Sequence, residues 1–191
     1  MISQLMDCKK IASESSKCKA YRSEAEDCIC EKESVSKYSP CAVQDNEDLI
    51  RQIYSPIHVD EDGRLKPLAF EDASNRGMSV NKKNYISKEE LEGKISKKLK
   101  IDENRGKKRS CKGVAIAKCS EIRGLKQKEK DSETRLFCIY DTATDKDKSH
   151  ADICQAISGR KAGSKARYEL RKVFSEFPFD LKKLFDKDSK K

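Results

Sequence analysis

Residues 57–70, IHVDEDGRLKPLAF, combine one of the two histidines of the chain with three consecutive acids, a glycine and an arginine. In an extended segment, His58 and Asp60 would share one face and could form an acid–base pair, although a pair alone lacks a nucleophile. A calcium loop is excluded, because alignment on Gly63 places His58 and Ala69 where acidic ligands are required. We favour a hairpin in which Gly63 adopts a positive φ and His58, at a strand edge, needs no partner.

Short motifs in and around this segment carry a resemblance. They are RQI (51–53), DGR (62–64), AF (69–70), MSV (78–80) and SHAD (149–152). With these motifs in this order, residues 48–155 resemble a group of small uncharacterised bacterial proteins. The resemblance carries no activity, but it implies a recurring constellation: Arg51, Asp62, Gly63, Arg64, Phe70 and His150.

The same region holds a predicted anion site made of Arg51, His58, Arg64 and His150. Arginine presents a fork of donors to phosphate, and histidine can donate beside it. These residues therefore make a nucleotide-binding enzyme or sensor one hypothesis. In the alternative interpretation, Arg64 pairs with Asp60 or Asp62, and His150 only begins a helix.

The nine cysteines show no C-x2-C pair, so the spacing predicts neither a metal nor a cofactor. Zinc held by distant ligands such as Cys111 and Cys119 is the alternative. The N-terminal sequence lacks the apolar core of a signal peptide, and no stretch is apolar enough to cross a membrane. We therefore expect a cytoplasmic protein with reduced thiols, in which Cys138 is a small core residue.

The charge of the chain permits an acidic partner. Lys and Arg number 42 against 33 Asp and Glu, for a net charge of +9, so the surface is dense in both signs. Two basic runs, 105–112 and 159–172, could contact nucleic acid or an acidic protein. The alternative for the second is a solvated amphipathic helix. The candidate contacts are Lys107, Lys108, Arg109, Arg160, Lys161, Arg167, Arg171 and Lys172.

Periodicity predicts the elements that position these residues. Helices are expected over 1–31, 46–54, from Ser87, from Ser149 and over 164–177, with a last turn at 180–185. Ser87 and Glu90 form a capping box. Extended segments are expected at 57–59, 65–70, 113–122 and 134–142, and the last two are expected to pair in antiparallel fashion across a charged loop.

Together these elements predict an α+β fold, with a small and mainly antiparallel sheet covered by two amphipathic helices. The predicted organisation is a cysteine-containing helical extension at 1–44, a core domain at 45–185 and a charged tail at 186–191. Hydrophobic residues make up 36% of the chain and charged residues 39%, so the core is expected to be small. The main functional hypothesis is a binding protein for nucleic acid or an acidic protein. A structural subunit that forms homo-oligomers through the N-terminal helix is a further alternative.

Overall fold

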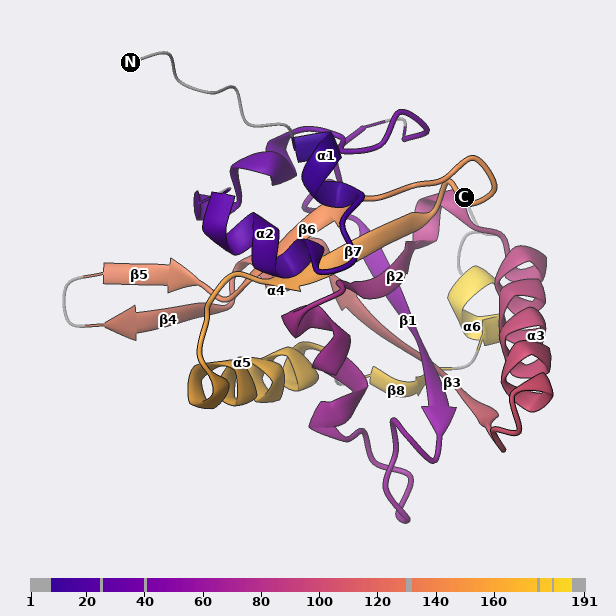
Figure 1. The fold of residues 1–191 in the computed structure, drawn as a ribbon. Helices are drawn as coiled ribbons and strands as arrows, with labels where there is room; N and C mark the ends of the chain where they lie inside the picture. The colour runs from indigo at the N-terminus through magenta and orange to yellow at the C-terminus, as the bar shows by residue number, and fades with distance from the viewer. Residues whose placement is uncertain are drawn as a thin grey trace.

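The structure, a computed structural model, describes residues 8–24, 26–39, 41–129, 132–174, 176–179 and 181–186. A six-stranded sheet forms its centre, with strand order β6-β7-β2-β1-β3-β8 and every neighbouring pair antiparallel (Figure 1). The strands are β1 Asp48–Ser55, β2 Met78–Lys82, β3 Ser110–Lys118, β6 Phe137–Asp141, β7 His150–Gln155 and β8 Glu176–Phe179. The predicted α+β class with a mainly antiparallel sheet is confirmed.

One face of the sheet carries the main hydrophobic core. Apolar side chains at alternate positions of the strands, such as Leu49 and Ile53 of β1, pack against two elements on this face. These elements are the 3-10 helix η2, Pro67–Ser74, and the helix α5, Arg160–Val173. From α5, Ala166 and Leu170 are buried in this core. A short helix, α4 Cys119–Arg123, adds Cys119 and Ile122.

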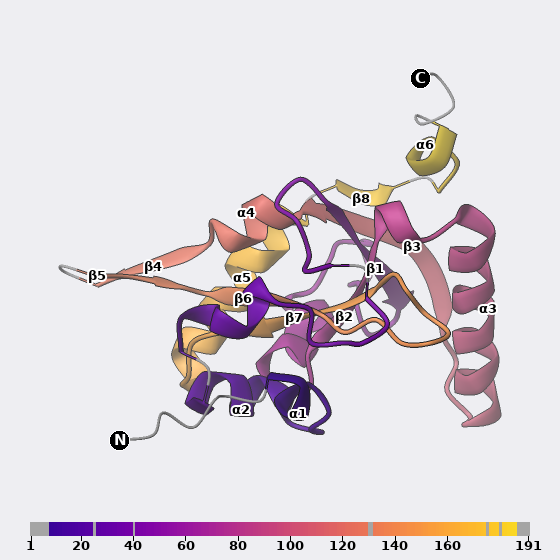
Figure 2. The same ribbon diagram turned by 90° about the horizontal axis from the view of Figure 1, so that it is seen from above.

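The opposite face is covered in two separate places. Helix α3, Lys88–Asn104, and helix α6, Leu181–Asp186, pack on the β1 and β3 side, where Leu91 and Ile95 meet Ile50 and Val114. The N-terminal elements α1 Cys8–Ala12, α2 Lys17–Glu24 and η1 Glu26–Lys32 cover β6 and β7. Figure 2 shows α3 at one end of the molecule and the N-terminal helices toward the other. Lys94 and Lys98 of α3 line the cavity described below.

The predicted helix from Ser87 is confirmed. The Ser87 hydroxyl accepts from the Glu90 N–H at 3.2 Å, and the Glu90 carboxylate accepts from the Ser87 N–H at 2.8 Å. These reciprocal bonds satisfy two amide groups that the first turn leaves without helical partners. The 3-10 turn η3, Lys83–Tyr85, connects β2 to this helix. The predicted last turn is α6.

Two predicted helices are strands. The segment predicted as a helix at 46–54 contains most of β1, Asp48–Ser55, and the segment that follows Ser149 forms β7. Both strands lie inside the sheet and are buried on both faces, so neither shows the alternation of apolar and polar residues that identifies a half-exposed strand. In β1 the apolar residues Leu49, Ile50, Ile53 and Tyr54 instead recur at a spacing that also suits a helix.

Other boundaries differ from the prediction as well. The two extended segments expected at 57–59 and 65–70 are joined by a single β-bridge, between Val59 and Leu65. From Pro67 on, the second segment is part of η2. The N-terminal helix is interrupted after Ala12 and divides into α1, α2 and η1. Helix α5 ends at Val173, so Phe177 belongs to β8. In the predicted charged tail, residues 187–191 lie outside the described residues.

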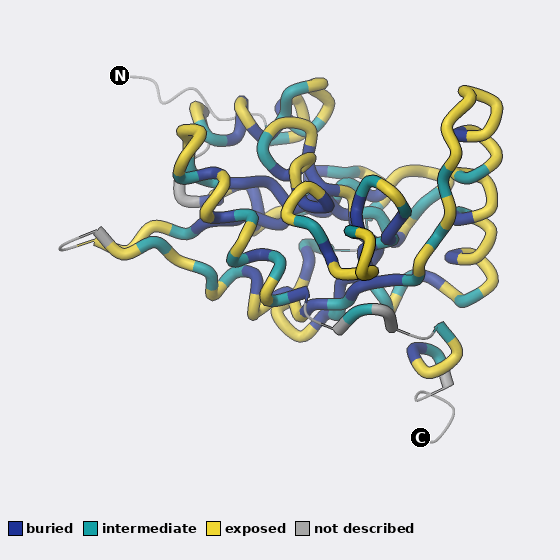
Figure 3. The backbone as a smooth tube through the Cα atoms, turned by 90° about the horizontal axis from the view of Figure 1, so that it is seen from below, coloured by how far each residue is buried: buried dark blue, intermediate teal, exposed yellow. Residues whose placement is uncertain are grey.

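The strands around residues 113–122 and 134–142 are not partners. Strand β3 pairs with β1 and β8, and β6 pairs with β7. The charged segment between them forms its own hairpin, β4 Lys126–Glu129 and β5 Ser132–Arg135, which projects from the body of the molecule (Figure 1). Its described residues are exposed or half-buried (Figure 3), so no apolar pattern marked it as a strand pair.

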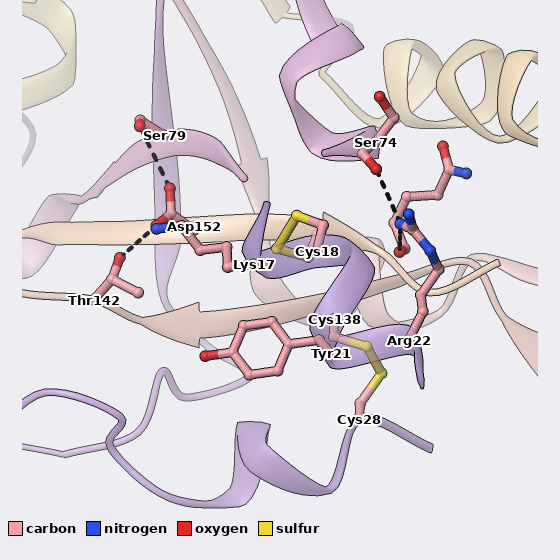
Figure 4. Close-up of a disulfide and its surroundings, with 12 residues drawn as sticks. Lys17, Cys18, Tyr21, Arg22, Cys28, Ser74, Ser79, Cys138, Thr142 and Asp152 are labelled. Carbon is pink, nitrogen blue, oxygen red and sulfur yellow. Dashed lines mark hydrogen bonds and ion pairs between the residues drawn. A yellow bond between two sulfur atoms is a disulfide. The ribbon is translucent and has the colours of Figure 1, made fainter. Parts of the chain in front are cut away.

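Three disulfides join six of the nine cysteines: Cys8–Cys30, Cys18–Cys154 and Cys28–Cys138. The prediction of reduced thiols is therefore wrong for these six, and Cys138 is a disulfide partner. Two of the bonds attach the N-terminal elements to β7 and β6 (Figure 4). Their half-cystines lie up to 136 residues apart, so no local spacing indicates the pairing.

Side-chain contacts reinforce the attachment of the N-terminal elements, here called the N-terminal cap (residues 8–32). The ring of Tyr21 stacks on Tyr140 of β6, with centroids 3.7 Å apart. Arg22 donates to the carbonyls of Ser74 and Gln155 at 3.0 and 2.9 Å (Figure 4). The apolar stripe predicted as an oligomer interface, including Ile11 and Tyr21, is thus buried within the same chain.

Candidate functional site

The candidate site is a cavity at the place where β1 and β2 separate. The two strands pair through Leu49–Lys82 and Ile50–Asn81. Past this point Arg51 reaches across instead, donating to the carbonyl of Ser79 in β2 at 2.9 Å and to that of Ala69 in η2 at 3.0 Å. A cavity of about 410 Å³ occupies the separation. Its lining is Arg51, Gln52, Tyr54, Ile57, His58, Asp72, Ser79, Val80, Asn81, Lys94, Lys98, Arg109, Asp147 and His150.

His58 lies in the wall of this cavity and is held in one orientation. Its Nδ1 accepts from the Tyr54 N–H at 3.1 Å, so the neutral ring carries its proton on Nε2. Burial, together with the positive charges of Arg51, Arg109 and Lys98, lowers the pKa of His58 to about 4. The ring is therefore neutral near pH 7. The expectation that His58 needs no partner is wrong, because the side chain is buried and accepts this hydrogen bond.

His150 approaches the cavity from β7. Its Nδ1 lies 2.8 Å from the Thr142 hydroxyl and 3.2 Å from the Thr142 carbonyl. The Thr142 hydroxyl donates to Asp152 at 2.9 Å, so the His150 Nδ1 is the donor toward Thr142. The predicted helix start at His150 is wrong, and the strand is what places this ring beside Asn81, its partner in β2.

Three further cations reach the cavity from α3 and from the residue before β3. Lys94 contacts Asp147 at 2.5 Å and donates to the Ser149 hydroxyl at 3.0 Å. Lys98 and Arg109 approach Asp102 at 3.6 and 3.0 Å. Sequence reasoning did not assign Lys94 or Lys98 to the site. The sequence signal for this pair was the four-residue spacing of Lys94 and Lys98 on a predicted helix, but an ordinary solvated helix face has the same spacing.

Two acids beside the cavity, Asp147 and Asp102, are ionised. Burial opposes ionisation of Asp147, but bonds from Lys94 and Ser149 outweigh it and lower the pKa of Asp147. Burial likewise opposes ionisation of Asp102, but Lys98 and Arg109 outweigh it, so the pKa of Asp102 is lowered. Both acids therefore remain charged near neutral pH and hold the lysine and arginine side chains in place beside the cavity.

The motifs that carry the resemblance converge here, with one exception. Arg51 is bonded to Ala69 and Ser79, and the Ser79 hydroxyl lies 3.4 Å from Asp152. Residues of RQI, AF, MSV and SHAD are therefore connected by hydrogen bonds. The DGR motif lies elsewhere, in the turn after residue 59, where Gly63 has a φ of +78° as predicted.

Arg64 does not join the site. Its side chain is 76% exposed and lies 3.3 Å from Asp62, as in the alternative interpretation. Among the nucleic-acid candidates, Arg109 lines the cavity, while Lys107 and Lys108 are exposed in the turn between α3 and β3. The other five, Arg160, Lys161, Arg167, Arg171 and Lys172, lie on α5, across the sheet from the cavity wall formed by α3 (Figure 2).

Within the described part of the chain, His, Cys, Asp and Glu side chains form no group of three or more that could hold a metal ion. In the same residues, no helix combines the length and apolar character needed to cross a bilayer. Comparisons with protein-family models, with curated protein sequences and with solved structures return no match.

Proposed function

We propose that the chain binds a small phosphate-bearing ligand, such as a nucleotide, in the cavity between β1 and β2. One observation carries the proposal: Arg51 and His58 line a single cavity with His150, which is distant from them in sequence, and with three more cationic side chains. Its volume of about 410 Å³ falls within the range of roughly 300–1,000 Å³ that is usual for small-molecule sites.

The donors of the cavity exceed its acceptors. A guanidinium has five N–H donors and an ammonium three, and neither group can accept. Arg109 donates to Asp102, and the buried Nε of Arg51 has no hydrogen-bond partner among the described residues. Phosphate oxygens accept several hydrogen bonds each and carry the matching charge. A phosphate would therefore use donors that the carboxylates leave unsatisfied.

The remaining lining suits the other parts of such a ligand. The Nε2–H of neutral His58 adds a donor without adding charge, because Nδ1 is occupied by Tyr54. Tyr54, Ile57 and Val80 supply apolar and aromatic surface in the same wall. A cavity lined by both charged groups and apolar surface favours a phosphate ester over inorganic phosphate alone.

Binding is tested by calorimetric titration with inorganic phosphate, pyrophosphate and adenosine monophosphate. The informative variant is Lys98→Gln, since Lys98 lines the cavity and its contact with Asp102 is long, at 3.6 Å. A hydrogen bond to a charged group contributes about 1.5–3 kcal/mol, so we expect Kd to rise roughly tenfold or more.

Lys97→Gln is the matched control. Lys97 is exposed on the same helix, outside the lining, and its replacement makes the same change in net charge. It should bind like the parent. Equal weakening by both variants would indicate general attraction by positive charge, and no saturable binding of any of the three ligands would contradict the proposal.

The basic surface of α5 supports the nucleic-acid hypothesis less well. Its cations are distributed along a helix that covers the core, and Lys172 is already bonded to Glu169 at 3.0 Å. Arg171 and Lys172 lie over the exposed ring of Tyr168. Cations spread over a helix surface serve solubility, whereas cations around a concavity select a ligand. Nucleic-acid binding by α5 stays a prediction.

The disulfides bear on the compartment in which the ligand would be met. Three disulfides in a domain of this size favour an oxidising environment, because cytosolic thiols are kept reduced. The cytoplasmic location expected from the N-terminal sequence stays a prediction, and the disulfides count against it. We therefore place the proposed binding activity in an oxidising compartment.

A further inference from the structure

A lysine and an aspartate that do not line the cavity meet in the interior of the fold. Lys82 is the last residue of β2 and Asp141 the last of β6, on the face that carries Val80 and Ile139. Nζ of Lys82 contacts Oδ2 of Asp141, and the exposed fraction of both side chains is 0%. The pair is fully removed from solvent, which is rare for a lysine.

The surroundings hold the two reactive groups in place. The Ala143 N–H donates to Oδ1 of Asp141 at 3.1 Å, so the other oxygen of the carboxyl group faces the amine. The ring of Tyr85 lies 4.4 Å from Nζ of Lys82. The backbone N–H of Lys82 donates to the Ser149 carbonyl at 2.7 Å and fixes the end of β2 against β7.

A second buried acid, Glu47, lies two residues before Leu49, the residue that pairs with Lys82 in the sheet. Glu47, just before β1, is 4% exposed, and its Oε2 has no hydrogen-bond partner among the described residues. Burial raises the pKa of Glu47; the charge of Lys82 acts against this rise and that of Asp141 adds to it. The Glu47 carboxyl therefore lies within electrostatic range of both members of the pair and is easier to protonate than an exposed glutamate.

We propose that Lys82 and Asp141 condense to an intramolecular isopeptide bond, with Glu47 as the group that transfers the protons. The Lys82 ammonium transfers one proton to Oδ2 of Asp141, with which it is in contact, and the neutral amine then attacks Cγ of the protonated carboxyl group. Glu47 accepts a proton from the attacking nitrogen as the C–N bond forms, and it gives this proton to the departing hydroxyl as the C–O bond breaks. The ammonium and the carboxylate thus become one amide and one water molecule, and the total charge does not change.

The interior location favours this step in two ways. Contact between the amine and the carboxyl group replaces an encounter in solution, and groups held this close react with very high effective molarity. Two opposite charges buried without water also incur a desolvation cost that their attraction only partly offsets, and the neutral amide removes both charges. The Ala143 N–H, bonded to Oδ1, would stabilise negative charge on that oxygen as the tetrahedral intermediate forms.

The expected product is a covalent link between β2 and β6 across β7. Reduction breaks the three disulfides but not an amide. Mass spectrometry of the reduced and denatured full chain therefore detects the proposed link without interference from the disulfides. We expect a mass below that calculated from the sequence by one water molecule. Tryptic digestion should give a branched peptide that contains both Lys82 and Asp141, because an acylated lysine is not cleaved.

Two variants test the assignment of roles. Lys82→Arg and Glu47→Gln should both recover the full sequence mass after reduction, within the resolution of a single water molecule. The unreduced mass of each variant should still be lower by two hydrogens per disulfide, which shows that the variant folded and formed its disulfides. Asp102→Asn is the matched control for Glu47→Gln, because it also replaces a buried carboxyl group by an amide. Its mass after reduction should still be one water molecule below the mass calculated from its sequence.

Each outcome decides a part of the proposal. A reduced parent chain with the full sequence mass would overturn it and leave Lys82 and Asp141 as a buried ion pair. A water loss that persists in Glu47→Gln would remove Glu47 from the reaction. Loss of the link in Asp102→Asn as well would show that the variants act through general destabilisation, which would equally overturn the role of Glu47.

Discussion

Replacement of His58 by Asn should remove a specific part of the acid sensitivity of the fold. The pKa of His58 is lowered by burial and by nearby cations from its ordinary value of 6.5 to about 4. Between these two values the unfolded chain binds a proton that the folded chain does not. Protonation therefore favours the unfolded chain, and stability falls as pH decreases from about 6.5 toward 4.

The size of the effect follows from the two pKa values. For one group, linkage gives a loss of about 2 kcal/mol at pH 5 and about 3 kcal/mol at pH 4 relative to neutral pH. Asp102 and Asp147 have lowered pKa values and remain ionised in the folded protein at pH 5. We therefore choose pH 5 for the comparison, because most of the His58 contribution has been lost there.

Urea unfolding at pH 7 and pH 5 measures this difference directly. Asn at position 58 keeps an oxygen near the place of Nδ1, so the bond from the Tyr54 N–H can persist, but the side chain does not titrate. The parent should lose about 2 kcal/mol more than the variant between the two pH values. Equal losses would refute the inference that His58 is buried in its neutral form.

The remaining predictions concern the turn and the cysteines. Gly63→Val should cost about 1–3 kcal/mol in a thermal melt, since φ at Gly63 is +78° and nothing lies within 4 Å of the added Cβ to cause a clash. Gly93→Ala is the control: the position is in open space on α3, and the replacement should stabilise the protein by up to about 1 kcal/mol. A Gly63→Val variant that melts at the same temperature as the parent would argue against backbone strain at Gly63. Thiol titration without reductant should find Cys41 and Cys111 in the native protein and Cys119 only after unfolding, because burial raises the pKa of Cys119 to about 12. Nine reactive thiols in the denatured, unreduced chain would contradict the three disulfides.

Local signals predicted the elements that depend on local chemistry. The capping box at Ser87 and the positive φ at Gly63 were read correctly, because each reflects bonds or dihedrals within four residues. Strands β1 and β7 were not, because their burial on both faces is produced by neighbours distant in sequence. The disulfide between Cys18 and Cys154 was not predicted for the same reason, since its two residues are 136 positions apart in the sequence.

The site was predicted in part. Of the four residues expected to bind an anion, three line one cavity: Arg51, His58 and His150. These three are the residues that strands and buried loops bring together. Arg64 was grouped with them by sequence proximity to His58, but the turn directs its side chain to solvent beside Asp62. The role of Lys98 depends on the angle at which α3 crosses the sheet, which a helical period does not determine.

The N-terminal cap is connected to the cavity through one buried acid. Asp152 has a 2% exposed side chain and contacts Lys17 of the cap at 2.6 Å and the Thr142 hydroxyl at 2.9 Å (Figure 4). Thr142 in turn orients His150, which lines the cavity. A carboxylate this deeply buried depends on its cation, because breaking such a pair leaves an uncompensated charge. The sequence boundary expected at residue 44 is therefore crossed by the contacts that hold the cavity wall, and the cap contributes to the geometry of the proposed binding site.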